Sequence, residues 1–134
     1  MKVHGRCHCG EIAYEAEIDG SQVGICHCAD CQTLTGTAYR VSAPAKAADL
    51  HFLKGAPKVY VKMAESGRPR AQAFCGTCGT PIYASDVEEP KVFNLRTGVM
   101  AERDTLKPSR QIWCRSALDW VHDLDGMQTH DKQA

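Results

Sequence analysis

The chain has 134 residues, of which 43% are hydrophobic and 24% are charged. That length suits one domain with a single core, and the composition is typical of a globular protein rather than a disordered one. Because 16 Lys and Arg residues balance 16 Asp and Glu residues, the formal net charge is zero. Nucleic-acid and anionic-membrane binders carry an excess of basic residues, so this balance argues against both partners.

The sequence also predicts a location and a domain boundary. No apolar run approaches the ~18 residues that a transmembrane helix needs. The segment Met1–Arg6 lacks the apolar stretch that follows the basic residues of a secretory signal. We therefore expect a cytoplasmic protein, with residues 1–124 forming the domain and the polar residues 125–134 forming a frayed tail.

Short strands separated by turns are predicted along most of the chain. Pro44 is expected to end one of them, and a turn is expected to join the strands at 50–53 and 59–61. Helix is scarce, with one short turn expected at 45–49 or at 116–121. The pattern predicts a mostly β fold of several coiled antiparallel sheets. The strands are expected at residues 12–18, 23–25, 37–42, 50–53, 59–61, 71–74, 81–83, 92–95 and 112–114.

Cysteine is the outlier of the composition, with eight residues. Their even number fits a disulfide framework, whereas their clustering and the expected cytoplasmic location fit metal sites. Cysteines one or two residues apart are poorly placed to bridge each other. Metal binding is therefore favoured, and the small number of large aromatic residues suggests that metal contributes to folding.

Four of the cysteines predict a closed metal site. Cys75 and Cys78 have the spacing of a zinc knuckle, and Gly79 permits the positive φ that such turns use. Cys7 and Cys9 are two residues apart, so in an extended stretch both sulfurs would face one side. Together these residues, the four-cysteine cluster, fill a tetrahedral shell. We expect them to hold a structural zinc.

Three further cysteines, the three-cysteine cluster, lie within six residues at Cys26, Cys28 and Cys31. Three protein ligands with one open position are typical of catalytic zinc. The alternative is that Cys114 or a histidine completes the shell; His27 is not favoured because it alternates away from Cys26 and Cys28. Thiolate ligands select Zn(II), Cu(I) or an iron–sulfur cluster. The division into four and three favours two zinc ions per chain, with an iron–sulfur cluster as the alternative.

Other residues receive simpler predictions. Trp113 and Trp120 are expected in the core rather than on a stacking surface. Arg40 and Arg96 have side chains that can hold a carboxylate through two hydrogen bonds, but solvent exposure is the expected outcome for both. Cys114 is expected to be a buried free thiol.

The order of these motifs resembles the glutathione-dependent formaldehyde-activating enzyme family, whose domain is shared with centromere protein V. The resemblance extends over about residues 4–121, nearly the whole chain. The matching segments are Cys7–Gly10, Cys26–Cys31, Thr35–Gly36, Phe74–Thr80 and Asn94–Gly98, together with Ser116 and Trp120.

The resemblance implies a β-tent fold, a structural zinc on the four-cysteine cluster and a second zinc, with an exchangeable position, on the three-cysteine cluster. It also implies that the three-cysteine cluster is catalytic. The implied reaction joins glutathione and formaldehyde to give S-hydroxymethylglutathione, a carbon–sulfur lyase reaction in reverse. The alternative is a non-catalytic zinc module that binds a thiol metabolite or a protein partner, because Asp30 is the only evident base beside Cys31.

Overall fold

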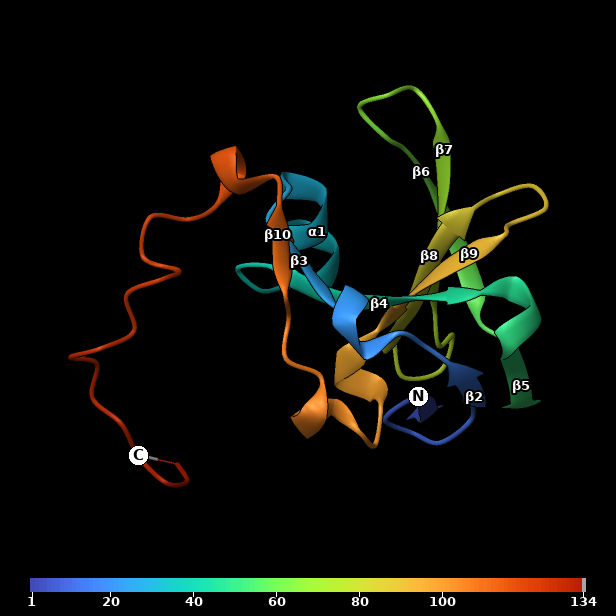
Figure 1. Ribbon diagram of the computed structural model, residues 1–134, viewed down its shortest axis with the longest axis horizontal. Coiled ribbons are helices and arrows are strands. Elements are labelled where there is room, and N and C mark those ends of the chain that lie inside the picture. The colour runs from blue at the N-terminus through green and yellow to red at the C-terminus, as the bar shows by residue number, and fades with distance from the viewer. Residues whose placement is uncertain (134) are drawn as a thin grey trace.

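The computed structural model describes residues 1–133, in which the strands form two sheets and one short α-helix lies against the larger sheet (Figure 1). The mostly β fold predicted from the sequence is confirmed. No helix in the described part of the chain combines the length and apolarity needed to cross a bilayer. The elements are β1 (Lys2–Arg6), β2 (Ala13–Glu17), β3 (Gly24–Cys26), α1 (Ala29–Thr35), β4 (Arg40–Lys46), β5 (Leu50–Lys54), β6 (Lys58–Met63), β7 (Pro69–Phe74), β8 (Pro81–Asp86), β9 (Val92–Arg96) and β10 (Arg110–Ile112).

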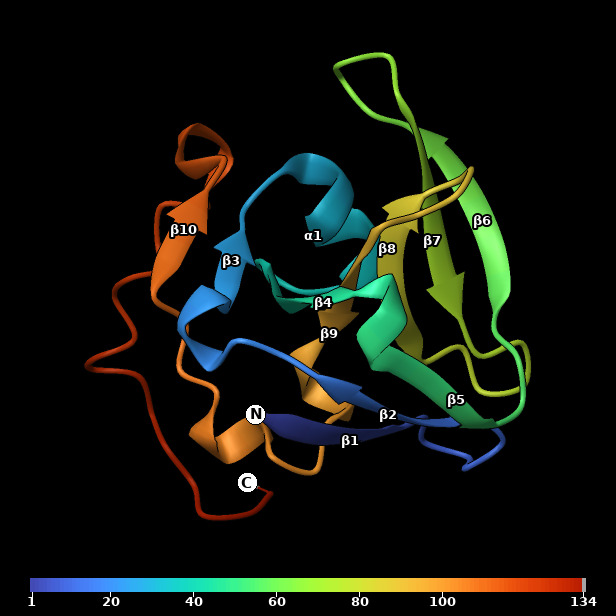
Figure 2. The ribbon, with the colours of Figure 1, turned by 45° about the vertical axis from the view of Figure 1, so that its right-hand side comes forward.

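The smaller sheet has three strands in the order β1-β2-β5, and the larger has seven in the order β10-β3-β4-β9-β8-β7-β6. Figure 2 shows the smaller sheet beneath the larger one, with α1 on the concave side of the larger sheet between β3 and β6. Neighbouring strands are antiparallel, as predicted, except that β10 runs parallel to β3.

The core lies between the two sheets and follows from the alternation predicted for β2. Tyr14 and Ala16 of β2 are buried, and they belong to one cluster with Ala43 of β4 and Leu95 of β9. Gly5 pairs with Tyr14 across β1 and β2, and a Cβ at Gly5 would lie 2.1 Å from the tyrosine ring. Because glycine has no side chain, the Tyr14 ring can pack directly against the backbone of Gly5 in the core.

The strand predicted at 37–42 does not stop before Pro44. It begins at Arg40 and continues through the proline to Lys46. Pro44 pairs with Asn94 of β9, whereas the pairing with β3 ends at Ser42. Because β4 has a partner on only one side at Pro44, the missing N–H is tolerated there.

The two strands predicted at 50–53 and 59–61 are present, but they do not pair with each other. β5 adds to the smaller sheet beside β2, and β6 forms the edge of the larger sheet beside β7. The connection between them passes from one sheet to the other.

Helix α1 was not predicted. Cys28 caps its first turn, where the Cys28 sulfur accepts a hydrogen bond from the Cys31 N–H. Gly36 ends the helix with a φ of 69°, which glycine adopts without strain. Of the two helical turns expected from the sequence, one is a 3₁₀ turn at Ala47–Asp49, and the other lies nearer the N-terminus than predicted, at Cys114–Ser116.

Candidate metal centres and the adjoining cavity

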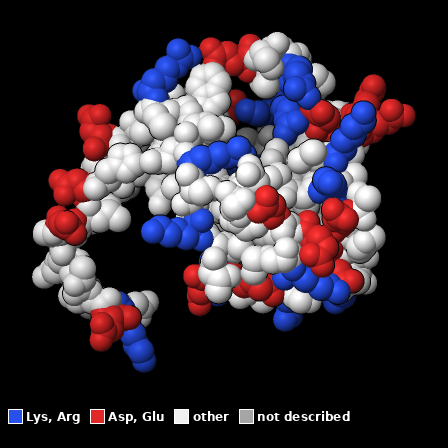
Figure 3. Space-filling model, in the orientation of Figure 1, with Lys and Arg blue, Asp and Glu red and all other residues white. Residues whose placement is uncertain are grey.

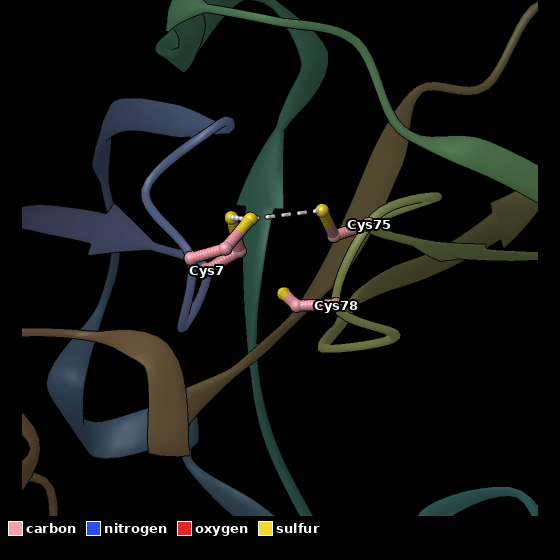
Figure 4. Close-up of side chains that lie close together, drawn as sticks. Cys7, Cys75 and Cys78 are labelled. Carbon is pink, nitrogen blue, oxygen red and sulfur yellow. Dashed lines mark hydrogen bonds between the residues drawn. The ribbon is translucent and has the colours of Figure 1, made fainter.

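The four-cysteine cluster joins the two sheets. Cys7 and Cys9 lie in the turn between β1 and β2, and Cys75 and Cys78 lie in the turn between β7 and β8. The four sulfurs lie within 4.8 Å of one another. Figure 4 shows the Cys7 side chain facing Cys75 and Cys78. Cys9 and Cys75, which are 66 positions apart in the chain, are thereby brought into contact.

The distances between these sulfurs fit a metal ion and exclude a disulfide. Cys9 Sγ lies 3.7 Å from both Cys7 Sγ and Cys75 Sγ, and all eight cysteines are free. A disulfide needs about 2.05 Å between sulfurs. Four thiolates around a tetrahedral zinc, with Zn–S distances of about 2.3 Å, lie about 3.8 Å apart. The cluster could therefore hold zinc.

The local geometry of this cluster differs in one respect from the prediction. Cys7 and Cys9 do not lie in an extended stretch; they lie in a turn in which the Gly10 N–H donates to the Cys7 carbonyl at 3.1 Å. In the second turn, which is one residue longer, the Gly79 N–H donates to the Cys75 carbonyl at 2.8 Å. Both glycines have a positive φ, 83° at Gly10 and 79° at Gly79. Two similar turns therefore present the sulfurs.

Hydrogen bonds favour the thiolate form of Cys7 and Cys78, whereas burial and the neighbouring sulfurs raise the pKa of Cys9. The Ile12 N–H donates to Cys7 Sγ at 3.2 Å. The hydroxyl oxygen of Thr80 accepts from the His8 N–H at 3.1 Å and lies 3.1 Å from Cys78 Sγ, so its own proton is free for the sulfur. This Thr80 bond is the largest contribution that lowers the pKa of Cys78 to about 5. An anionic sulfur is the form that binds metal.

The three-cysteine cluster lies where β3 passes into α1. Cys26 ends the strand, Cys28 caps the helix and Cys31 lies in its first turn. Their sulfurs lie within 4.8 Å of one another, and the Cys31 N–H donates to Cys28 Sγ at 3.3 Å. A hydrogen bond with Cys31 lowers the pKa of Cys26, and the same bond together with burial raises the pKa of Cys31. Without a metal, these sulfurs therefore share protons.

No fourth cysteine, histidine or carboxylate joins this cluster among the residues that the structure describes. His27 is fully buried, and its Nε2 lies 2.7 Å from the Gln111 side-chain oxygen. Cys114 is exposed, contrary to the prediction of a buried thiol, and it lines a separate hollow with Tyr39 and His122. Neither alternative for completing the shell is therefore supported by the geometry.

The three-cysteine cluster lines a cavity of about 410 Å³ on the concave face of the larger sheet. Paired residues of antiparallel strands present their side chains on the same face. Cys26 pairs with Arg40, and Ser42 pairs with Arg96. All four line the cavity, and their neighbours along the strands, such as Leu95, belong to the core. The larger sheet therefore packs on the core with one face and forms the cavity wall with the other.

Arg40 and Arg96 are buried in this wall, at 5% and 8% exposure, contrary to the predicted solvent exposure. Gln72 Oε1 accepts hydrogen bonds from both, at 3.1 Å from Arg40 and 3.0 Å from Arg96. Arg96 also donates to Ser42 Oγ at 2.7 Å. Burial, followed by the positive charge of Arg40, lowers the pKa of Arg96 to about 9, so Arg96 remains a cation at neutral pH.

Trp113 and Trp120 are partly exposed, at 39% and 51%, so the prediction that they lie in the core is wrong. Trp113 follows β10 with a φ of 56°, an uncommon left-handed conformation for a residue other than glycine. Its side chain lines the cavity. The sequence has no local signal for the position of Trp113 at the cavity, because β10 reaches the cavity only through its pairing with β3.

Comparison with known proteins agrees with this arrangement. The family model of the glutathione-dependent formaldehyde-activating enzymes matches residues 2–116, and the chain belongs to this family. A crystal structure of a Rhodobacter sphaeroides protein, a structural-genomics target, is similar at 22% sequence identity and a TM-score of 0.61. That similarity covers 83% of this chain and 99% of the other, and it supports the fold. No curated protein matches the chain.

Proposed function

We propose that this chain is a zinc-dependent carbon–sulfur lyase that forms or breaks the S-hydroxymethyl adduct of glutathione, or of a similar thiol, with formaldehyde. One observation carries the proposal. The sulfurs of Cys26, Cys28 and Cys31 form a group with no fourth ligand among the described residues, and this group lines a cavity large enough for a small metabolite. Membership of the family supports the same reaction class.

Two zinc ions per chain are proposed, one on each cysteine cluster. In the four-cysteine cluster the ion would be fully coordinated and would connect the two sheets. In the three-cysteine cluster, zinc would supply a vacant position at which a thiol loses its proton.

The residues of the chain then serve to hold the reactants together. In the forward reaction, the thiol sulfur bonds to the carbon of formaldehyde, the C=O π electrons move to oxygen, and that oxygen takes up a proton. The cysteines fix the place of the thiol, and the cationic side chains of Arg40 and Arg96 favour a negatively charged sulfur. Holding both reactants in one cavity replaces a bimolecular encounter with a local one.

Exchange NMR tests the proposal. It measures the rate at which free glutathione and its formaldehyde adduct interconvert, with and without the zinc-loaded protein. We expect faster interconversion with the wild-type protein, background rates with Cys31→Ser, and full acceleration with Cys114→Ser, whose thiol lies outside both clusters. No acceleration at stoichiometric wild-type protein would reject the lyase.

A second candidate is a non-catalytic zinc module that binds a thiol metabolite or a protein partner. The observation that favours it concerns Asp30, the only base that the sequence offers beside the cluster. Its carboxylate is paired with Lys62 at 2.9 Å rather than free to take a proton. Tight binding of glutathione in calorimetry, without faster interconversion in the NMR experiment, would favour this function over the lyase.

A further inference from the structure

The cavity wall contains two cations that lack acidic partners. Each guanidinium has five N–H donors. Within the described residues, Arg40 uses one of them and Arg96 uses two in hydrogen bonds to side chains. Both Nε atoms are buried without an acceptor. The acceptors that are present, Gln72 and Ser42, are neutral. Burying a charge is unfavourable unless it is paired. An anionic acceptor in the cavity would therefore stabilise both guanidinium groups.

The other cations of the cavity are different, because each lies at a carboxylate or in solvent. Lys62 pairs with Asp30, and Arg68 and Arg70 both pair with Asp86. Arg110 is exposed. Figure 3 shows Lys and Arg atoms gathered around a hollow in the upper part of the molecule. In a chain of zero net charge, this concentration distinguishes the cavity.

Acidic side chains do not offset the positive charge around the cavity. Glu65 is the one carboxylate among the residues that line the cavity, and it lies 3.5 Å from Arg115 on the outside. Within the described residues, no carboxylate pairs with Arg40 or Arg96, and the anionic groups nearest to them are the sulfurs of the three-cysteine cluster. A ligand with its own carboxylate would supply that pairing.

We propose that Arg40 and Arg96 form a binding site for the carboxylate of the thiol substrate, so that the protein selects thiols that carry a carboxylate over neutral thiols of the same size. This inference rests on the proposed function, because it takes the thiol to bind at the three-cysteine cluster. Cys26 and Arg40 are cross-strand partners, so the two groups lie side by side. The arginines retain their orientation through Gln72, which accepts from both. Planar guanidinium groups suit the two oxygens of a carboxylate.

A competing explanation is that the two positive charges only offset the negative charge of the thiolates. In that case the shape of the cation is unimportant, and a lysine serves as well as an arginine. A carboxylate site requires the planar pair of donors, which lysine lacks. The two explanations therefore differ in what they predict for Arg96→Lys.

The test compares 3-mercaptopropionate with 2-mercaptoethanol, which differ in a carboxylate and a hydroxyl at similar length. Their affinities for the zinc-loaded protein are measured by calorimetry. Because hydrogen bonds to charged groups are stronger than neutral ones, we expect the wild-type protein to bind 3-mercaptopropionate about tenfold more tightly. Arg96→Lys should remove most of this preference and leave the affinity for 2-mercaptoethanol unchanged. Arg103→Gln, an exposed arginine outside the cavity, should leave both affinities unchanged.

Each other outcome overturns the inference in a distinct way. Equal affinities of the two thiols for the wild-type protein reject the carboxylate site and leave thiol binding intact. Unchanged affinities in Arg96→Lys show that the charges only offset the thiolates. Failure of either thiol to bind rejects the proposed function together with the inference. Circular dichroism and zinc content establish that each variant is folded, and Arg40→Lys provides a second variant of the same site.

Discussion

Lys62 Nζ lies 2.9 Å from Asp30 Oδ2, and this ion pair joins β6 to α1 beside the cavity. In the larger sheet, β6 is at one edge, and β3, which leads into α1, is next to the other edge. The two residues meet because the sheet curls until its far edge approaches the helix (Figure 2). The curl encloses the cavity, and the ion pair lies beside the three-cysteine cluster.

The first prediction concerns Asp30, which is paired and therefore not expected to act as the base. Asp30→Asn should leave the NMR interconversion rate within about threefold of the wild type, since a general base contributes about 10²–10⁴-fold. Lys62→Met is the control that breaks the same pair from the other side. A loss of about a hundredfold in Asp30→Asn but not in Lys62→Met would assign the base to Asp30 and contradict the prediction.

The second prediction separates the roles of the two clusters. Cys78→Ser removes a ligand from the cluster that joins the sheets, and a structural zinc contributes about 10–16 kcal/mol to folding. That contribution is as large as the whole free energy of unfolding of a typical domain, ~5–15 kcal/mol, so this variant should be unfolded. Cys31→Ser should stay folded and lose one zinc per chain. Circular dichroism and metal analysis measure both results, and equal unfolding of the two variants would show that the roles are not distinct.

The third prediction is a pH dependence. Hydrogen bonds, of which the one with the Thr80 hydroxyl contributes most, lower the pKa of Cys78 to about 5, so the thiolate persists as the pH falls toward that value. Thr80→Val removes the donor and raises the pKa of Cys78. Protons then compete with the metal at a higher pH, and zinc should leave the protein at a higher pH than in the wild type. Ultrafiltration followed by metal analysis along a pH series measures the midpoint.

Thr80→Ser is the matched control for this experiment. It retains the hydroxyl and should keep the wild-type midpoint. If Thr80→Val and Thr80→Ser release zinc at the same pH as the wild type, the hydrogen bond to Cys78 does not govern metal retention.

The fourth prediction concerns removal of the metal. A chelator titrated into the protein should take the zinc of the three-cysteine cluster first, because that ion has three protein ligands and borders a cavity. Circular dichroism should not change at this stage, whereas thiol binding should be lost. The second zinc should leave only together with the folded signal. Loss of structure with the first equivalent of zinc would contradict this order.

The sequence was most informative where the signal is local. Alternation in β2 predicted its buried face, and the spacing of the cysteines predicted both clusters. Gly79 was recognised as the positive-φ residue of its turn. These features depend on a few neighbouring residues, so one amino-acid sequence is sufficient to predict them. The domain boundary at residue 124 stays a prediction.

The features that were missed depend on contacts between distant segments. Arg40 and Arg96 are buried because the larger sheet curls over them, and nothing in their neighbours along the chain indicates this. Helix α1 has seven residues, too few for a helical period to be visible, and its ends are defined by Cys28 and Gly36. Trp113 lies at the cavity because β10 runs parallel to β3, a pairing with no sequence signature.

The turn that carries Cys7 and Cys9 also has a consequence for synthesis. Cys75 and Cys78 emerge from the ribosome only after more than half of the chain, so the first two thiols wait without their partners. During that interval they are open to oxidation or to another thiol-seeking ion. Until all four sulfurs hold a metal ion, the two sheets would lack this connection.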